Sequence, residues 1–228
     1  MKIRDLETIR IQLKRGDTYS LDVLTPEAYI HPLIGEAQFN ERTIGGRKNV
    51  FEKPGLGMLV GPGEYNITCK TYGFDCIVAY AAGNQMPRER AQAVAGCETH
   101  IIGKGAARRE VREILGHDGY SHRLRVGETV NRRGGWSSWP PHSFDKDPAN
   151  ASKFEEVFYY FTDPKDGVAF QVQGNKIEPV LTGTEREIEL GYHPVVGAPG
   201  VKLLYVWFYL SPEDKIYPRF AEDLGGYK

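Results

Sequence analysis

Short stretches rich in Val, Ile, Tyr, Phe and Thr, separated by glycine and proline, recur along the whole chain. Branched and aromatic residues favour strands, while Gly and Pro interrupt regular structure. Helical periodicity is nearly absent, and only "PRERAQAVAG" predicts one or two helical turns. The pattern therefore predicts an all-β sandwich or barrel. The predicted strands are 19–24, 37–43, 57–60, 65–71, 76–81, 111–115, 123–130, 155–162, 168–172, 187–190 and 203–210.

The length of 228 residues suits one large domain or two small ones. A shift in composition falls at "IIGKGAA", where two glycines flank a lysine and charged residues follow. This shift predicts a domain boundary that divides the chain into 1–104 and 105–228. Each part is long enough for one small β-barrel.

Charge and hydropathy exclude several classes of protein. Lys plus Arg is 29 and Asp plus Glu is 30, a balance that gives no general attraction to nucleic acid or to an acidic membrane. The short basic run "AARREVR" predicts a solvated strand or loop. No run of about 18 apolar residues is present, and the charged N-terminus does not resemble a signal peptide. Three cysteines without a C-x-x-C spacing fit a reducing compartment, so we expect a cytoplasmic protein.

Two histidines and a pair of glutamates are candidate metal ligands. His142 follows two prolines in "WPPH", and His193 precedes proline in "GYHP", so the backbone is restrained at both. In "EEVFYYFT" both faces of the predicted strand are apolar, so one glutamate of the pair is expected to point into an interior. A buried carboxylate is costly unless it is paired or binds a cation. Hydrogen-bonded structural residues at barrel corners are the alternative.

A wider set of motifs is similar to a known family. The order "VGETVNRRGGWSSWPPHSFD", "FEEVFYYF" and "GYHPVVGAPG" resembles the 5-deoxy-glucuronate isomerase family of myo-inositol catabolism. That family is related to the 5-keto-4-deoxyuronate isomerases, and both are double cupins, which are pairs of jelly-roll-like β-barrels. The resemblance is strongest over about 109–210 and weaker before it.

The resemblance implies a divalent metal ion (zinc, manganese or iron) bound in the second barrel. In the family a His-x-His pair, a glutamate and a later histidine are the ligands. These positions correspond to His142, Glu156 and His193, while Phe144 replaces the second histidine of the pair. The resemblance therefore implies a metal site that has lost one of four ligands.

The implied reaction is the isomerisation of 5-deoxy-glucuronate, an aldehyde, to 2-deoxy-5-keto-gluconate, a ketone. Glu156 and Tyr160 share a strand face, which makes them the expected catalytic residues, with core packing as the alternative role of Tyr160. The implied partners are a small sugar acid and further copies of the chain, with no nucleic acid and no membrane.

The substrate carboxylate suits an arginine fork. Arg123 and Arg133 flank the second barrel, and Arg47 lies in the first; surface solvation is the alternative for each. Trp139 is a candidate for stacking on the sugar.

Two other classes of function remain open from the sequence. A cupin with a degenerate site would act as a sugar-acid binding or scaffold protein. A site of two histidines and one carboxylate is also the arrangement that iron oxygenases use, which would give a metal-dependent enzyme of other chemistry.

Overall fold

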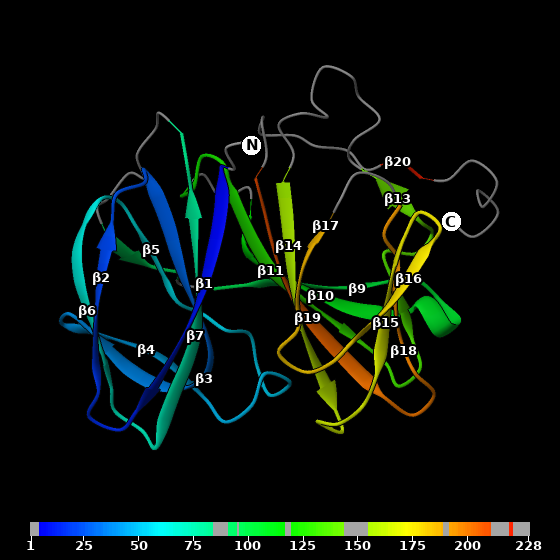
Figure 1. The fold of residues 1–228 in the computed structure, drawn as a ribbon, viewed down its shortest axis with the longest axis horizontal. Coiled ribbons are helices and arrows are strands. Elements are labelled where there is room, and N and C mark those ends of the chain that lie inside the picture. The colour runs from blue at the N-terminus through cyan, green and yellow to red at the C-terminus, as the bar shows by residue number, and fades with distance from the viewer. Residues whose placement is uncertain are drawn as a thin grey trace. The chain divides into compact units, whose positions relative to one another are not determined.

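The computed structural model describes residues 5–83, 91–94, 96–116, 120–143, 155–188, 192–210 and 219–220. Apart from one short 3-10 helix, the regular structure of these residues is β-strand, which confirms the predicted all-β class (Figure 1). The described residues contain no helix with the length and apolar character of a membrane span.

The chain divides into two compact units with a boundary unlike the predicted one. The first unit contains Met1–Cys97 and Ile114–Arg125, and the second contains Glu98–Glu113 and Val126–Lys228. The predicted boundary between residues 104 and 105 lies inside the second unit. The division falls between residues 97 and 98 instead, and residues 114–125 also belong to the first unit, which composition does not reveal.

The first unit is built on one eight-stranded sheet. Its main path runs β1-β7-β3-β5-β8, while β2, β4 and β6 join through β3 and β6. Apolar side chains of these strands form one core cluster that includes Ile30, Phe39, Met58 and Phe74. The strands are β1 (Leu6–Lys14), β2 (Thr18–Val23), β3 (Glu27–Phe39), β4 (Arg42–Arg47), β5 (Met58–Val60), β6 (Gly63–Cys69), β7 (Gly73–Ala81) and β8 (Ala91–Ala93).

The second unit contains a six-stranded sheet of order β17-β14-β19-β11-β10-β9, a four-stranded sheet of order β12-β18-β15-β16, and the pair β13-β20. Strands β10 and β11 run across the division between the units. The elements are β9 (Glu98–Ile102), the 3-10 helix η1 (Gly105–Ala107), β10 (Arg109–Leu115), β11 (Leu124–Asn131), β12 (Trp136–Ser137), β13 (His142–Ser143), β14 (Glu155–Asp163), β15 (Ala169–Gln173), β16 (Lys176–Val180), β17 (Glu185–Ile188), β18 (Val195–Gly197), β19 (Lys202–Leu210) and β20 (Arg219–Phe220).

Two sequence predictions of local structure are wrong. The predicted strand 37–43 contains a hairpin turn, because Asn40 adopts a positive φ of 48° and separates β3 from β4. Asparagine tolerates this left-handed conformation better than most residues do. The described part of "PRERAQAVAG" contains the strand β8 rather than helical turns, since Ala91–Ala93 pairs with β5.

Strand β14 lies inside the six-stranded sheet, between β17 and β19. Its residues from 156 to 162 are all buried, which confirms that both faces of this strand are covered. On one face Phe158 and Tyr160 join a core cluster with Leu203 and Tyr205 of β19. Because alternate side chains of a strand share a face, Glu156 points to the same side as this apolar cluster.

Candidate functional site

The segment that carries His142 is held by a short polar network. The amide Nδ2 of Asn131, at the end of β11, donates to the carbonyl of Gly135 at 3.2 Å and to Oγ of Ser137 at 3.1 Å. Nδ1 of His142 lies 3.4 Å from the carbonyl oxygen of Pro140. The chain entering the histidine is therefore restrained by hydrogen bonds as well as by the two prolines.

His193 is held in place through its backbone. Nε2 of Gln171, on β15, donates to the carbonyl oxygens of His193 and Pro194 at 3.0 and 3.3 Å. Gln171 itself accepts a hydrogen bond from the hydroxyl of Tyr160 at 2.5 Å. The imidazole of His193 is buried, so this buried chain of hydrogen bonds fixes the position from which the ring projects.

Glu156 and His193 come together in the interior of the second unit. Oε2 of Glu156 lies 3.7 Å from Nε2 of His193, and both side chains are buried. This oxygen accepts no hydrogen bond from any residue that the structure describes. Burial raises the pKa of Glu156 from its ordinary 4.5 to about 8. A buried acceptor without a donor is costly, and such atoms are commonly explained by a bound water, an ion or a ligand.

The ring of His142 packs edge-on against that of His193. Their centroids are 5.1 Å apart and the planes meet at 79°, while Phe158 packs against His193 from another side at 6.0 Å. Burial, with smaller contributions from His193 and Arg109, lowers the pKa of His142 to about 3. The imidazole of His142 is therefore neutral at physiological pH, which is the form that binds metals.

The neutral imidazole of His142, the imidazole of His193 and the carboxyl oxygen of Glu156 are donor types that suit a divalent cation. The spacing of these side chains matches a single ion only in part, because the donor atoms of His142, Glu156 and His193 do not all lie within 4.8 Å of one another. Binding of one ion by all three side chains requires their donor atoms to move closer together. Phe144, the predicted replacement of a fourth ligand, lies outside the described residues.

A second group of possible ligands lies at the surface of the same unit. Glu98, His100 and Glu113 place one donor atom each within 4.8 Å of one another. Glu98 and His100 belong to the edge strand β9, whose five residues are all exposed. Glu98 lies directly opposite Glu113 in the register, so strand pairing accounts for this group. Water solvates the exposed carboxylate of Glu98, so this group does not need a cation to stabilise its charge.

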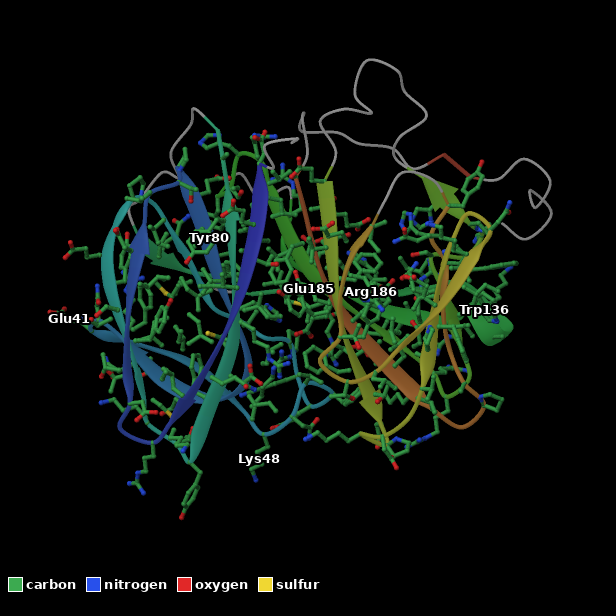
Figure 2. The ribbon with its side chains drawn as sticks, viewed as in Figure 1. Glu41, Lys48, Tyr80, Trp136, Glu185 and Arg186 are labelled. Carbon is green, nitrogen blue, oxygen red and sulfur yellow. The ribbon has the colours of Figure 1, made fainter. Side chains whose placement is uncertain are left out.

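Two further predicted site residues have contacts within the second unit. Tyr160 is fully buried and donates to Gln171, and burial raises its pKa well above 10. These contacts favour a packing role over proton transfer. Trp139 is half-buried and lies beside Trp136, which is labelled in Figure 2, with ring centroids 5.2 Å apart. A role of Trp139 in sugar stacking stays a prediction.

The predicted arginines are occupied by other partners. Arg123 belongs to the first unit and donates to Asp5 and to the carbonyl of Ala82. Arg133 is exposed and pairs with Asp163 at 2.7 Å. The third candidate, Arg47, is buried among carbonyl groups of the first unit. The described bonds of these arginines therefore go to groups other than the proposed metal ligands.

Sequence reasoning missed two polar residues of the second unit. Gln171 interrupts the apolar alternation of its strand on the inward side, which is a readable signal of a buried polar role. Arg109 lies in the basic run that predicted solvated structure, yet its side chain is half-buried and donates to the carbonyl of Trp139 at 3.2 Å. The same run also contains Arg112, which is buried against Glu128.

Replacement of Glu156 by glutamine should stabilise the metal-free protein but remove the stabilisation that a bound metal ion gives. In the metal-free protein, Glu156→Gln should raise the free energy of unfolding by roughly 1–3 kcal/mol near neutral pH, because it replaces a carboxyl group that burial forces to take up a proton with a neutral amide of the same size. The raised pKa of Glu156 makes the metal-free wild type less stable as the pH rises from about 4.5 to about 8, so the advantage of the variant should grow over that window. Added Mn²⁺ should stabilise the wild type and not the variant.

Thermal unfolding in EDTA and in excess Mn²⁺ measures both effects. Glu155→Gln, on the neighbouring half-buried residue, is the matched control and should behave as the wild type does in both buffers. If Glu156→Gln melts at a lower temperature than the wild type in EDTA, Glu156 stabilises the metal-free protein, and its proposed role as a metal ligand that is unfavourable without the ion is wrong.

Comparison with known proteins places these residues in a family context. The sequence pattern of the KduI/IolB family matches residues 4–225. A 5-deoxy-glucuronate isomerase of Bacillus licheniformis is 32% identical over 217 residues, which cover 88% of this chain and 78% of that protein. A protein of the same name from Bacillus velezensis is 30% identical over 216 residues, with the same coverage.

Solved structures confirm the predicted fold. The crystal structure of an IolB-like protein from Salmonella typhimurium LT2 superposes with a TM-score of 0.84 at 21% identity, covering 97% of this chain and 89% of that one. Oxalate decarboxylase of Bacillus subtilis, which has Mn(II) centres, superposes with a TM-score of 0.61 at 11% identity, covering 95% and 71%. The all-β architecture of this chain is a double cupin.

Proposed function

The chain belongs to the KduI/IolB family and is an isomerase, and on that premise we propose that it converts 5-deoxy-glucuronate into 2-deoxy-5-keto-gluconate. Relatives that carry the name of this activity share about 30% of their residues with the chain over most of its length. The observation in this molecule that best supports the proposal is the buried, unpartnered oxygen of Glu156 beside His193.

The proposed reaction requires two proton movements and no net gain or loss of atoms. The aldehyde carbon is C1: one proton passes from C2 to C1 and one from the C2 hydroxyl to O1, so that C1 becomes a CH2OH group and C2 becomes the ketone. The intermediate is an enediolate, whose negative charge must be stabilised where it develops. An apolar interior favours such stabilisation because electrostatic interactions are stronger where water is excluded.

We propose that His142, Glu156 and His193 hold a divalent ion. When bound, such an ion polarises a carbonyl oxygen and stabilises negative charge on it. The role of the chain is to hold the three ligands on fixed elements: His142 after two prolines, Glu156 inside a sheet, and His193 through Gln171. Phe158 packs against His193 and Tyr205, and this apolar wall helps to exclude water from the ligands.

The direct test is turnover of 5-deoxy-glucuronate by the purified, metal-loaded protein, followed by proton NMR in the presence and absence of oxygen. We expect loss of the aldehyde signal at a rate on the order of 1–100 per second, without consumption of oxygen. Oxygen uptake without isomerisation would favour the oxygenase alternative. Absence of turnover by protein with stoichiometric metal would overturn the proposed substrate.

The proposed reaction is a step of myo-inositol catabolism, and we propose that the chain acts in that route, in the cytoplasm. A neighbouring set of inositol-degradation genes would support this placement. A strain that lacks the gene should fail to grow on inositol if no other isomerase replaces it.

A further inference from the structure

Arg109, the first residue of β10, lies next to the segment that carries His142. Its Nη1 donates to the carbonyl oxygens of Ala107 at 3.0 Å and Trp139 at 3.2 Å, and Trp139 is three residues before the histidine. The positive charge of Arg109 contributes to the lowered pKa of His142, and Tyr205 of the core cluster acts on the pKa of Arg109. Arg109 therefore lies close to both the ligand segment and the apolar interior.

The environment of Arg109 leaves its charge without a counter-ion. Both described hydrogen bonds come from Nη1 and go to neutral carbonyls, so Nε and Nη2 donate to no residue that the structure describes. No described carboxylate lies within ion-pair distance, although the side chain is half-buried. Burial lowers the pKa of Arg109, which shows that the charged form is desolvated. A partly buried guanidinium in this state favours binding of an anion.

The neighbouring arginines lack this combination of features. Arg112 is buried but pairs with Glu110 and with Glu128, the latter at 3.0 Å. Arg108 and Arg132 are exposed, so water solvates their charges. Arg186 lies opposite Phe158 in the register of β17 and β14 and has a buried Nε without a hydrogen bond, but its charge is 3.6 Å from the carboxylate of Glu178. Arg109 differs from these arginines because it is half-buried and has no described carboxylate beside it.

We propose that the Nε and Nη2 edge of Arg109 binds the carboxylate of the sugar acid and so selects acids over neutral sugars. This inference rests on the proposed function for the identity of the substrate. In 5-deoxy-glucuronate the carboxylate is C6, whereas the reaction takes place at C1 and C2. A separate cationic residue is therefore needed to hold the far end of the molecule, and the planar guanidinium matches a carboxylate with two parallel hydrogen bonds.

The test compares two ligands that differ only at the carboxylate. Binding of D-glucuronate and of the neutral D-glucuronamide is measured by calorimetry with metal-loaded protein. We expect the wild type to prefer the acid by at least about 10-fold, Arg109→Gln to lose that preference, and Arg109→Lys to fall between them. Arg108→Gln removes the same charge from the adjacent, exposed position and should keep the wild-type preference.

Kinetics with 5-deoxy-glucuronate provide an independent measurement. Arg109→Gln should raise KM by about 10- to 100-fold with a smaller change in kcat and no change in metal content. A wild type that prefers glucuronate but does not turn over the deoxy acid would contradict the proposed substrate and leave the role of Arg109 standing. The proposed role of Arg109 is overturned if the preference of Arg109→Gln for glucuronate over glucuronamide stays within about twofold of the wild-type preference. It is also overturned if the wild type binds the two ligands equally well, or binds neither of them.

Discussion

Replacement of His193 by alanine should weaken Mn²⁺ binding by at least about 100-fold and reduce isomerase activity at least as much. The imidazole is buried, faces Glu156 at 3.7 Å and packs against His142, so its removal deletes one proposed ligand and the partner of another. Gln171 bonds to backbone carbonyls at this corner, and these bonds do not depend on the side chain. The variant should therefore fold, with a loss of roughly 1–3 kcal/mol from the emptied space.

The measurements are metal content after dialysis and the dissociation constant for Mn²⁺ from calorimetry. His100→Ala is the matched control because it removes a histidine from the exposed group with Glu98 and Glu113. It should leave both quantities unchanged. If His100→Ala loses the metal and His193→Ala retains it, the ion binds at the surface of β9 and the buried site is wrong.

The largest expected loss of stability comes from the first unit, at Arg47. This guanidinium is 1% exposed and donates to four backbone carbonyls, with distances from 2.7 to 3.3 Å. Nη2 also lies 3.4 Å from Nε2 of His31. Arg47→Met fills much of the volume but removes the guanidinium donor from those four acceptors. We expect a loss of about 4 kcal/mol or more, since each unsatisfied buried acceptor costs about 1–3 kcal/mol before relaxation.

Thermal unfolding should show this loss as a fall of roughly 8–16 °C in Tm if the chain unfolds in one transition. Arg47→Lys should recover little, because one ammonium cannot replace a fork that reaches four carbonyls. Arg42→Met, at the exposed start of the same strand, is the control and should shift Tm by less than about 2 °C. A comparable small shift for Arg47→Met would mean that water replaces the guanidinium at no cost.

Much of the fold could be predicted because local composition dictates it. The buried strands β14 and β19 are continuous runs of branched and aromatic residues, and each was predicted to within one residue. The turn at Asn40 was missed because the residues on both sides of it also favour strands. Residues 114–125 belong to the first unit, where the Glu27 carboxylate accepts hydrogen bonds from Ser121 and from the backbone amide of His122. These contacts join residues more than 90 positions apart, and no local signal encodes them.

The candidate site could be predicted in part for the same reason. The prolines beside His142 and the apolar run after Glu156 are local signals, and the structure places both residues near His193. Arg109 was not predicted because its role depends on which way the first residue of β10 faces. Arg109 and Arg112 belong to the same short basic run, yet Arg109 donates to the carbonyl of Trp139 and Arg112 pairs with the buried Glu128. Only the tertiary structure distinguishes the roles of these two arginines.

The most direct test of the central claim is a crystal structure of the protein grown with Mn²⁺, with anomalous scattering measured at the manganese edge. We predict one strong peak within about 2–2.5 Å of a Glu156 carboxylate oxygen, of Nε2 of His193 and of a ring nitrogen of His142. A peak only between Glu98, His100 and Glu113, or none in the interior of the second unit, would contradict it.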